Sequence, residues 1–67
     1  MQRTEISISE ENHGAGAMLI IERGNPVWNP DIDVIRFRIK KSGGISPEMS
    51  AQDWSIAIDE ARRAGIL

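Results

Sequence analysis

The sequence predicts a single α+β domain over residues 1–67, a βββα arrangement in which one C-terminal helix packs a three-stranded antiparallel meander. Three observations predict it. Two segments alternate between apolar and polar residues, with the period of two that half-buried strands have, and a short run between them is apolar throughout. The last third of the chain carries the start, the apolar face and the stop of a helix.

Residues 4–10 form the first predicted strand. Its apolar residues, Ile6 and Ile8, alternate with polar ones, which predicts a half-buried strand at an edge of the sheet. The polar segment 10–16 that follows contains two glycines and predicts the connection of a hairpin.

Residues 17–23 form a continuous apolar run and predict the central strand. The four large apolar residues from Met18 to Ile21 cannot all lie on one side of a strand, so both faces of the sheet receive apolar side chains. Two registers remain open. Either Leu19 and Ile21 point to the helix while Met18 and Ile20 lie on the outer face, or the reverse holds.

Residues 24–33 contain two Asn-Pro steps around Trp28. Proline removes backbone donors and biases the preceding residue away from a helix, so this segment is predicted to be an irregular, stiff loop. Residues 34–41 alternate again, with apolar residues facing inward and basic residues facing outward. They are predicted to form the third strand.

The C-terminal helix has two candidate starts. Ser46 before Pro47 fits an N-cap followed by the first helical position. Ser50 before Ala51, with Asp53 three residues beyond the serine, fits a second N-cap.

The stop and the apolar face of this helix are clearer. Arg62 and Arg63 suit the negative end of the helix dipole, and Gly65 fits the left-handed residue of a Schellman stop. Residues at helical spacing make a core face with Trp54 as its one large anchor. With one face of the central strand, the predicted core consists of Ile6, Ile8, Ile35, Phe37, Ile39, Trp54 and Ile58.

The composition limits how such a domain is stabilised and what it binds. A chain of 67 residues buries a modest fraction of its surface, and no cysteine is present to form a disulfide, which favours oligomerisation or a partner. The net charge of −2 argues against bulk attraction to nucleic acid. No apolar run approaches the ~20 residues of a membrane span, and no secretion signal is recognised. A cytoplasmic location without membrane contact is expected.

Catalytic, metal and cofactor sites are not predicted. The one histidine, His13, has no serine or aspartate arranged with it, and no cysteine nucleophile exists. The alternation of Asn29, Asp31 and Asp33 is that of a calcium-loop opening, but the glycine and the final glutamate of such a loop are missing. The protein is therefore expected not to be an enzyme and to hold no metal or cofactor.

A basic ladder runs along the third predicted strand. Either its cations pair with acidic residues such as Glu22 on the neighbouring strand, or they form a positive stripe that contacts phosphate in a DNA groove. The alternative function is therefore nucleic-acid binding, and its predicted residues are Arg36, Arg38, Lys40 and Lys41.

Three apolar patches favour a protein partner instead. They are the outer face of the sheet, Trp28 in its loop, and, if the helix starts at Pro47, an exposed seam of Met49 and Ile56 on the polar side of the helix. The leading prediction is a non-enzymatic protein-binding module of the inhibitor or adaptor type, which acts by surface occlusion. The prediction includes a homodimer as an alternative to a monomer that binds another protein. The predicted partner-binding residues are Met18, Ile20, Trp28, Arg36, Arg38, Met49 and Ile56.

Small acidic chains without cysteine are common among phage-encoded inhibitors of host proteins. The likeness here is one of size and composition only, because no motif carries it.

Overall fold

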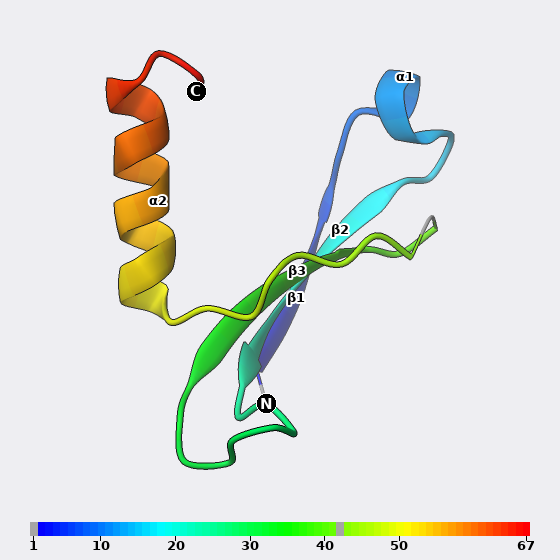
Figure 1. The fold of residues 1–67 in the computed structure, drawn as a ribbon. Helices are drawn as coiled ribbons and strands as arrows, with labels where there is room; N and C mark the ends of the chain where they lie inside the picture. Colours follow the sequence, from blue (N-terminus) through cyan, green and yellow to red (C-terminus); the bar gives the residue numbers. More distant parts are fainter. Residues whose placement is uncertain (1, 42) are drawn as a thin grey trace.

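The computed structural model describes residues 2–41 and 43–67 and has the predicted order of three strands followed by a helix (Figure 1). The elements are β1 (Gln2–Ser7), α1 (Glu10–His13), β2 (Met18–Gly24), β3 (Val34–Ile39) and α2 (Ala51–Arg63). The α+β fold class with its βββα arrangement is confirmed, and one short helix is added between the first two strands.

The three strands form one antiparallel sheet in the order β1-β2-β3. As predicted, β2 is the central strand and β1 lies at an edge. The register places Ile21 opposite Phe37 and Ile20 opposite Arg38. Because successive side chains point to opposite faces, these pairs assign every strand residue to one of two faces.

The two faces of the sheet differ in character. The first, which we call the open face, is mostly apolar and consists of Gln2, Thr4, Ile6, Leu19, Ile21, Arg23, Ile35, Phe37 and Ile39. The second, which we call the charged face, includes Glu5, Met18, Ile20, Glu22, Val34, Arg36 and Arg38. The helix contacts the open face, so the register is the one that leaves Met18 and Ile20 on the side away from the helix.

The connection between β1 and β2 contains a one-turn helix, α1, that the sequence analysis did not predict. It begins after Ser9, whose side-chain oxygen accepts a hydrogen bond from the backbone N–H of Asn12 at 3.3 Å. A serine followed by two glutamates in the first turn favours a helix start. β1 consequently ends at Ser7, and Ile8 lies beyond the strand that was predicted to contain it.

The outer edge of β3 is covered by residues 44–49, an irregular segment that runs antiparallel to the strand. Met49 and Ile35 exchange two backbone hydrogen bonds of 2.7 and 3.2 Å. The side-chain oxygen of Ser46 accepts a hydrogen bond from the backbone N–H of Phe37 at 2.8 Å. Ser46 therefore extends the sheet rather than capping a helix, and the first of the two candidate helix starts is wrong.

The second candidate start is correct, since α2 begins at Ala51. The side chain of Ser50 accepts a hydrogen bond from the backbone N–H of Asp53 at 3.1 Å. The helix ends in the predicted Schellman motif, in which Gly65 has a φ of +74° and the N–H of Ile66 donates to the carbonyl of Ala61 at 2.9 Å.

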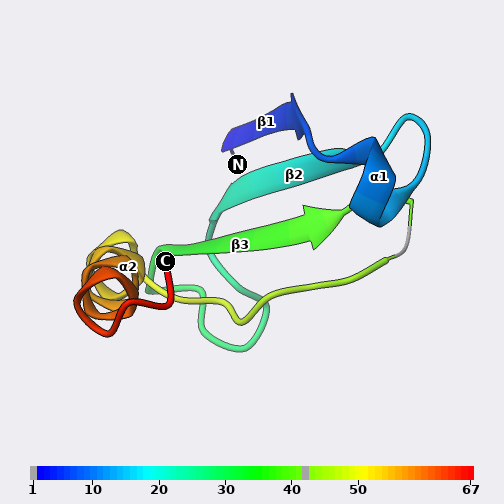
Figure 2. The same cartoon turned by 90° about the horizontal axis from the view of Figure 1, so that it is seen from above.

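Trp54 anchors α2 to the sheet. Its ring meets the ring of Phe37 edge-on, with the centroids 4.7 Å apart, and its indole N–H donates to the carbonyl of Ile35 at 2.7 Å. Beyond this anchor α2 rises from the end of the sheet at which β3 begins and diverges from the strands, rather than lying across them (Figures 1 and 2). No residue of α2, all of which the structure describes, is buried.

The predicted core is therefore partly wrong. Ile6 and Ile58 were expected inside, but they are 45% and 38% exposed, because α2 leaves much of the open face uncovered. The buried apolar side chains within residues 2–41 and 43–67 include Ala17, Ile20 and Val34. The last two belong to the charged face, so the densest packing lies on the side opposite the helix.

Candidate functional site

A buried carboxylate organises the charged face. Glu22 is only 8% exposed, and its Oε1 atom accepts hydrogen bonds from Arg36 at 3.2 Å and from Arg38 at 3.1 Å. The bond from Arg38, whose effect outweighs the opposing effect of burial, lowers the pKa of the Glu22 carboxyl group below its ordinary value of 4.5. Glu22 stays ionised at neutral pH and ties two neighbouring strands together.

The remaining cations of the basic ladder also have partners. The ammonium of Lys40 lies 3.9 Å from a carboxylate oxygen of Glu5, and that of Lys41 donates to the carbonyl of Ala15 at 3.3 Å. A hydrogen bond from Arg3, followed by the charge of Lys40, lowers the pKa of Glu5. The structure thus contains the cross-strand pairing that was one of the two interpretations of the ladder. In this pairing Arg36 and Arg38 bind the carboxylate of Glu22 rather than extending into solvent.

The Trp28 loop, residues 25–33, is ordered by its own hydrogen bonds. The side-chain amide of Asn25 donates to the carbonyl of Ile32 at 2.6 Å and so closes the loop at its base. Inside the loop, the N–H of Asn29 donates to the carbonyl of Pro26 at 3.3 Å. The side chain of Asn29 accepts from the N–H of Asp31 at 3.1 Å. Together with the two prolines, these bonds restrict the backbone around Trp28.

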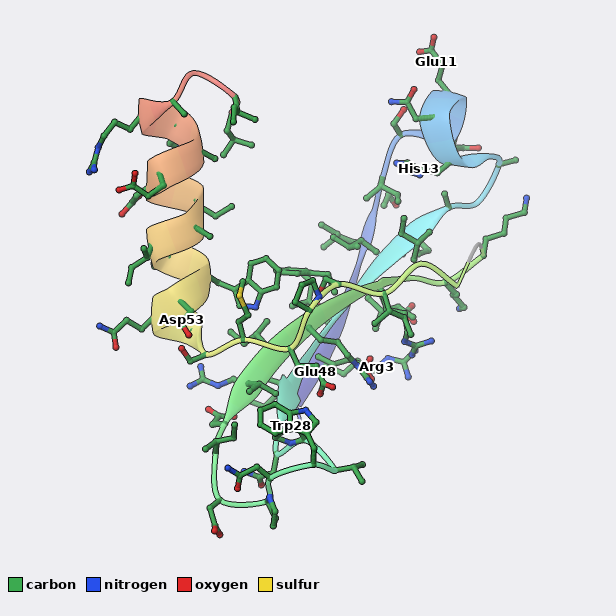
Figure 3. All side chains as sticks on the ribbon, viewed as in Figure 1. Arg3, Glu11, His13, Trp28, Glu48 and Asp53 are labelled. Carbon is green, nitrogen blue, oxygen red and sulfur yellow. The ribbon has the colours of Figure 1, made fainter. Side chains whose placement is uncertain are left out.

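The loop presents an apolar tip to solvent. Trp28 is 62% exposed and the neighbouring Val27 is fully exposed. Trp28 does not close the end of the core, because Pro26 rather than Trp28 is the buried residue of the loop. The indole N–H of Trp28 points to Glu48, with its nitrogen 3.4 Å from a carboxylate oxygen (Figure 3).

The open face carries three shallow hollows that the sequence analysis did not predict. One of about 360 Å³ lies between β3 and α2 and is lined by Phe37, Trp54 and Ile58. A second of about 250 Å³ lies over β1 and β2, and a third of about 320 Å³ lies over the far end of β3. The sequence analysis missed this surface because it expected the helix to cover the open face.

Two predicted partner-binding patches need correction. Ile20 was placed on an exposed outer face, but it is 1% exposed, because it sits among the long side chains of the charged face, with Glu5 and Arg38 as its cross-strand neighbours. Met18 beside it is half-buried. The apolar residues of the charged face therefore offer little contact surface to a partner.

The seam of Met49 and Ile56 is not formed as predicted. It required a helix that starts at Pro47, whereas Met49 lies in the segment paired with β3, opposite Ile35. Ile56 is 53% exposed on α2 and stands without Met49 as its helical neighbour.

The described residues also bear on metals and membranes. No group of three histidine, cysteine, aspartate or glutamate side chains suited to a metal ion occurs within residues 2–41 and 43–67. Over the same ranges, no helix has the length and apolar character needed to cross a membrane.

Comparison with protein-family models, with curated proteins and with solved structures gives no match for this chain. Its function is therefore inferred from the surfaces described above.

Proposed function

We propose that the protein is a non-enzymatic binding module of the inhibitor or adaptor type, which inserts Trp28 into an apolar cleft on another protein. The observation that supports this proposal is the exposure of a large aromatic side chain, at 62%, on a loop closed by its own hydrogen bonds. Tryptophan is the residue type most enriched among the few that dominate binding energy at protein interfaces.

The order of the Trp28 loop lowers the cost of binding. A flexible loop loses conformational freedom when it docks, and each side chain that becomes fixed costs about 0.5–1.5 kcal/mol. In this loop the bond from Asn25 to Ile32 and the buried Pro26 fix the backbone before any partner arrives. More of the free energy of burying the indole ring is then available for affinity.

The charges around the loop indicate the chemistry of the partner. Arg23 is paired with Asp33 at 2.7 Å, whereas Asp31 and Glu48 form no ion pair within the described part of the chain. The rim of the Trp28 loop is thus acidic, in keeping with the net charge of −2. An apolar cleft rimmed by basic side chains is the complementary surface. A Trp28 loop that fills such a cleft blocks the access of other molecules to it, and the partner protein is inhibited in this way.

Nucleic-acid binding through Arg36, Arg38, Lys40 and Lys41 remains the alternative. Arg36 and Arg38 already direct N–H groups to the Glu22 carboxylate, and the negative charge of that carboxylate weakens the attraction of a phosphate group to them. Nucleic-acid binding is therefore placed second. It predicts that Arg36→Glu abolishes binding of a mixed-sequence duplex, and that the affinity of the wild type falls steeply with salt.

Replacing Trp28 with alanine is expected to weaken partner binding at least ~30-fold, because a central aromatic anchor is lost. A photo-crosslinking residue at the fully exposed position 27 captures the partner from an extract of the organism that makes the protein. The captured protein is then purified and titrated with wild type and Trp28→Ala by calorimetry.

The matched control is Ile56→Ala, which removes another exposed apolar side chain from a distant element. Wild-type affinity is expected for this variant. A partner that binds Trp28→Ala as tightly as wild type, or a chain that binds only duplex DNA and loses it with Arg36→Glu, contradicts the proposal.

A further inference from the structure

The open face is a continuous apolar surface that α2 leaves mostly exposed. Strand residues from β1, β2 and β3 supply its floor, and Trp54 and Ile58 of α2 supply one wall. Figures 1 and 2 show the helix standing away from the sheet, so that the two elements form an open angle. Large apolar patches of this kind on a small soluble chain mark an interface.

The accessible surface area of the chain is larger than that of a compact monomer of the same mass. Its accessible surface is 5008 Å², whereas a compact monomer of 7.4 kDa has roughly 4,200 Å². The excess of about 800 Å² equals the area that each partner loses in an interface of standard size. The radius of gyration agrees, since it is 13.4 Å, against about 11 Å for a compact chain of this length.

The charges of the open face favour a second copy of the same chain. Among the strand residues that form its floor, all of which the structure describes, the charged one is Arg23 at the end of the sheet, and it is paired with Asp33. A two-fold interface brings the same patch of both copies together, so a patch with unpaired charge would repel itself. Two apolar sheet faces whose arginine is already paired can instead pack at ~10 Å, as the layers of a β-sandwich do.

We propose that two copies of this chain form a two-fold homodimer, open face against open face, with the two α2 helices flanking the shared apolar layer. The pairing supplies the core that a single copy lacks, because the buried side chains of each copy lie mainly on its charged side. The Trp28 loop stays free in the dimer, since residues 24–27 border a hollow with Glu22, Val34 and Arg36 of the opposite face. The homodimer and the proposed function therefore use different surfaces, and each can be tested without the other.

Light scattering of the purified full chain across a concentration series tests the dimer. The wild type is expected at twice the chain mass of 7.4 kDa, with a thermal midpoint that rises with protein concentration. Ile6→Glu on β1 and Ile58→Glu on α2 each place a charge in the shared layer. Each is expected to raise the dimer dissociation constant ~100-fold or more, because the charge is buried without a partner.

Ile56→Glu is the matched control. It makes the same change two residues from Ile58 in the same helix, at a side chain that lines none of the hollows of the open face described above. It is expected to stay dimeric. If a Glu variant unfolds instead, the concentration dependence of the wild-type thermal midpoint decides the matter. A wild type that is monomeric at every concentration, or a dimer broken by Ile56→Glu and not by Ile58→Glu, overturns the proposal.

Discussion

Trp54→Ala is expected to lower the free energy of unfolding by about 3 kcal/mol, which is the lower part of the range for deleting a packed indole. The substitution removes the edge-on contact with Phe37 and the hydrogen bond to the carbonyl of Ile35. A chain of 67 residues has a total stability of roughly 3–10 kcal/mol, so this loss is a large part of it. Urea denaturation followed by circular dichroism at one fixed protein concentration measures it.

The second tryptophan provides the control for this experiment. Trp28→Ala removes the same side chain from an exposed position, and it is expected to change the free energy of unfolding by no more than ~0.5 kcal/mol. Trp54→Phe keeps an aromatic ring while it loses the hydrogen bond, and an intermediate loss is expected. Equal losses for Trp54→Ala and Trp28→Ala would show that α2 is not anchored through Trp54.

Glu22→Gln is expected to lower the free energy of unfolding by about 2 kcal/mol at pH 7. Glutamine preserves the shape of the side chain but removes the charge that binds Arg36 and Arg38. Glu60→Gln is the matched control, because Glu60 pairs with Arg63 at 2.6 Å on the exposed surface of α2. An exposed pair of this type contributes about 0.3–0.5 kcal/mol.

The pH dependence of the free energy of unfolding distinguishes the effect of the charge of Glu22 from the effect of its packing. Because the hydrogen bond from Arg38 lowers the pKa of Glu22 in the folded chain, the folded state releases this proton more readily than the unfolded chain does. The stabilisation is therefore fully present above pH 4.5, the ordinary pKa, and is lost as the pH falls through the lowered value. Glu5, whose pKa is lowered by Arg3 and Lys40, adds to the loss in the same window.

The expected result is that wild type and Glu22→Gln differ at pH 7 and converge in acid. Urea denaturation of both at several pH values between 7 and 3 measures this convergence. A difference that does not shrink as the pH falls would mean that Glu22 acts through packing rather than through its ion pairs with Arg36 and Arg38.

If the homodimer and the proposed function both hold, each dimer displays two Trp28 loops. A partner with two clefts in the right positions would then bind with greater avidity than either loop provides alone. Ile58→Glu, which is expected to separate the copies, would lower binding to such a partner while leaving the affinity of a single loop unchanged.

The sequence by itself determined the elements of this protein and their order. Alternation in residues 4–10 and 34–41 and the apolar run of residues 17–23 correctly predicted three strands with the second of them, β2, at the centre. Ser50 and Gly65 correctly marked the second candidate start and the stop of α2. These signals are local, because capping bonds and side-chain alternation depend on residues a few positions apart.

Only the tertiary structure decided which surfaces are covered and which are exposed. The apolar face of α2 predicted a covered sheet, but residues 44–49 first pair with β3, so the helix starts at the end of the sheet and diverges from it. Ile20 and Glu22, by contrast, are buried among charged side chains that alternation alone places in solvent. Burial depends on where segments that are distant in the sequence meet. The periodicity of a helix, or of the segment before it, does not determine the direction in which the helix runs.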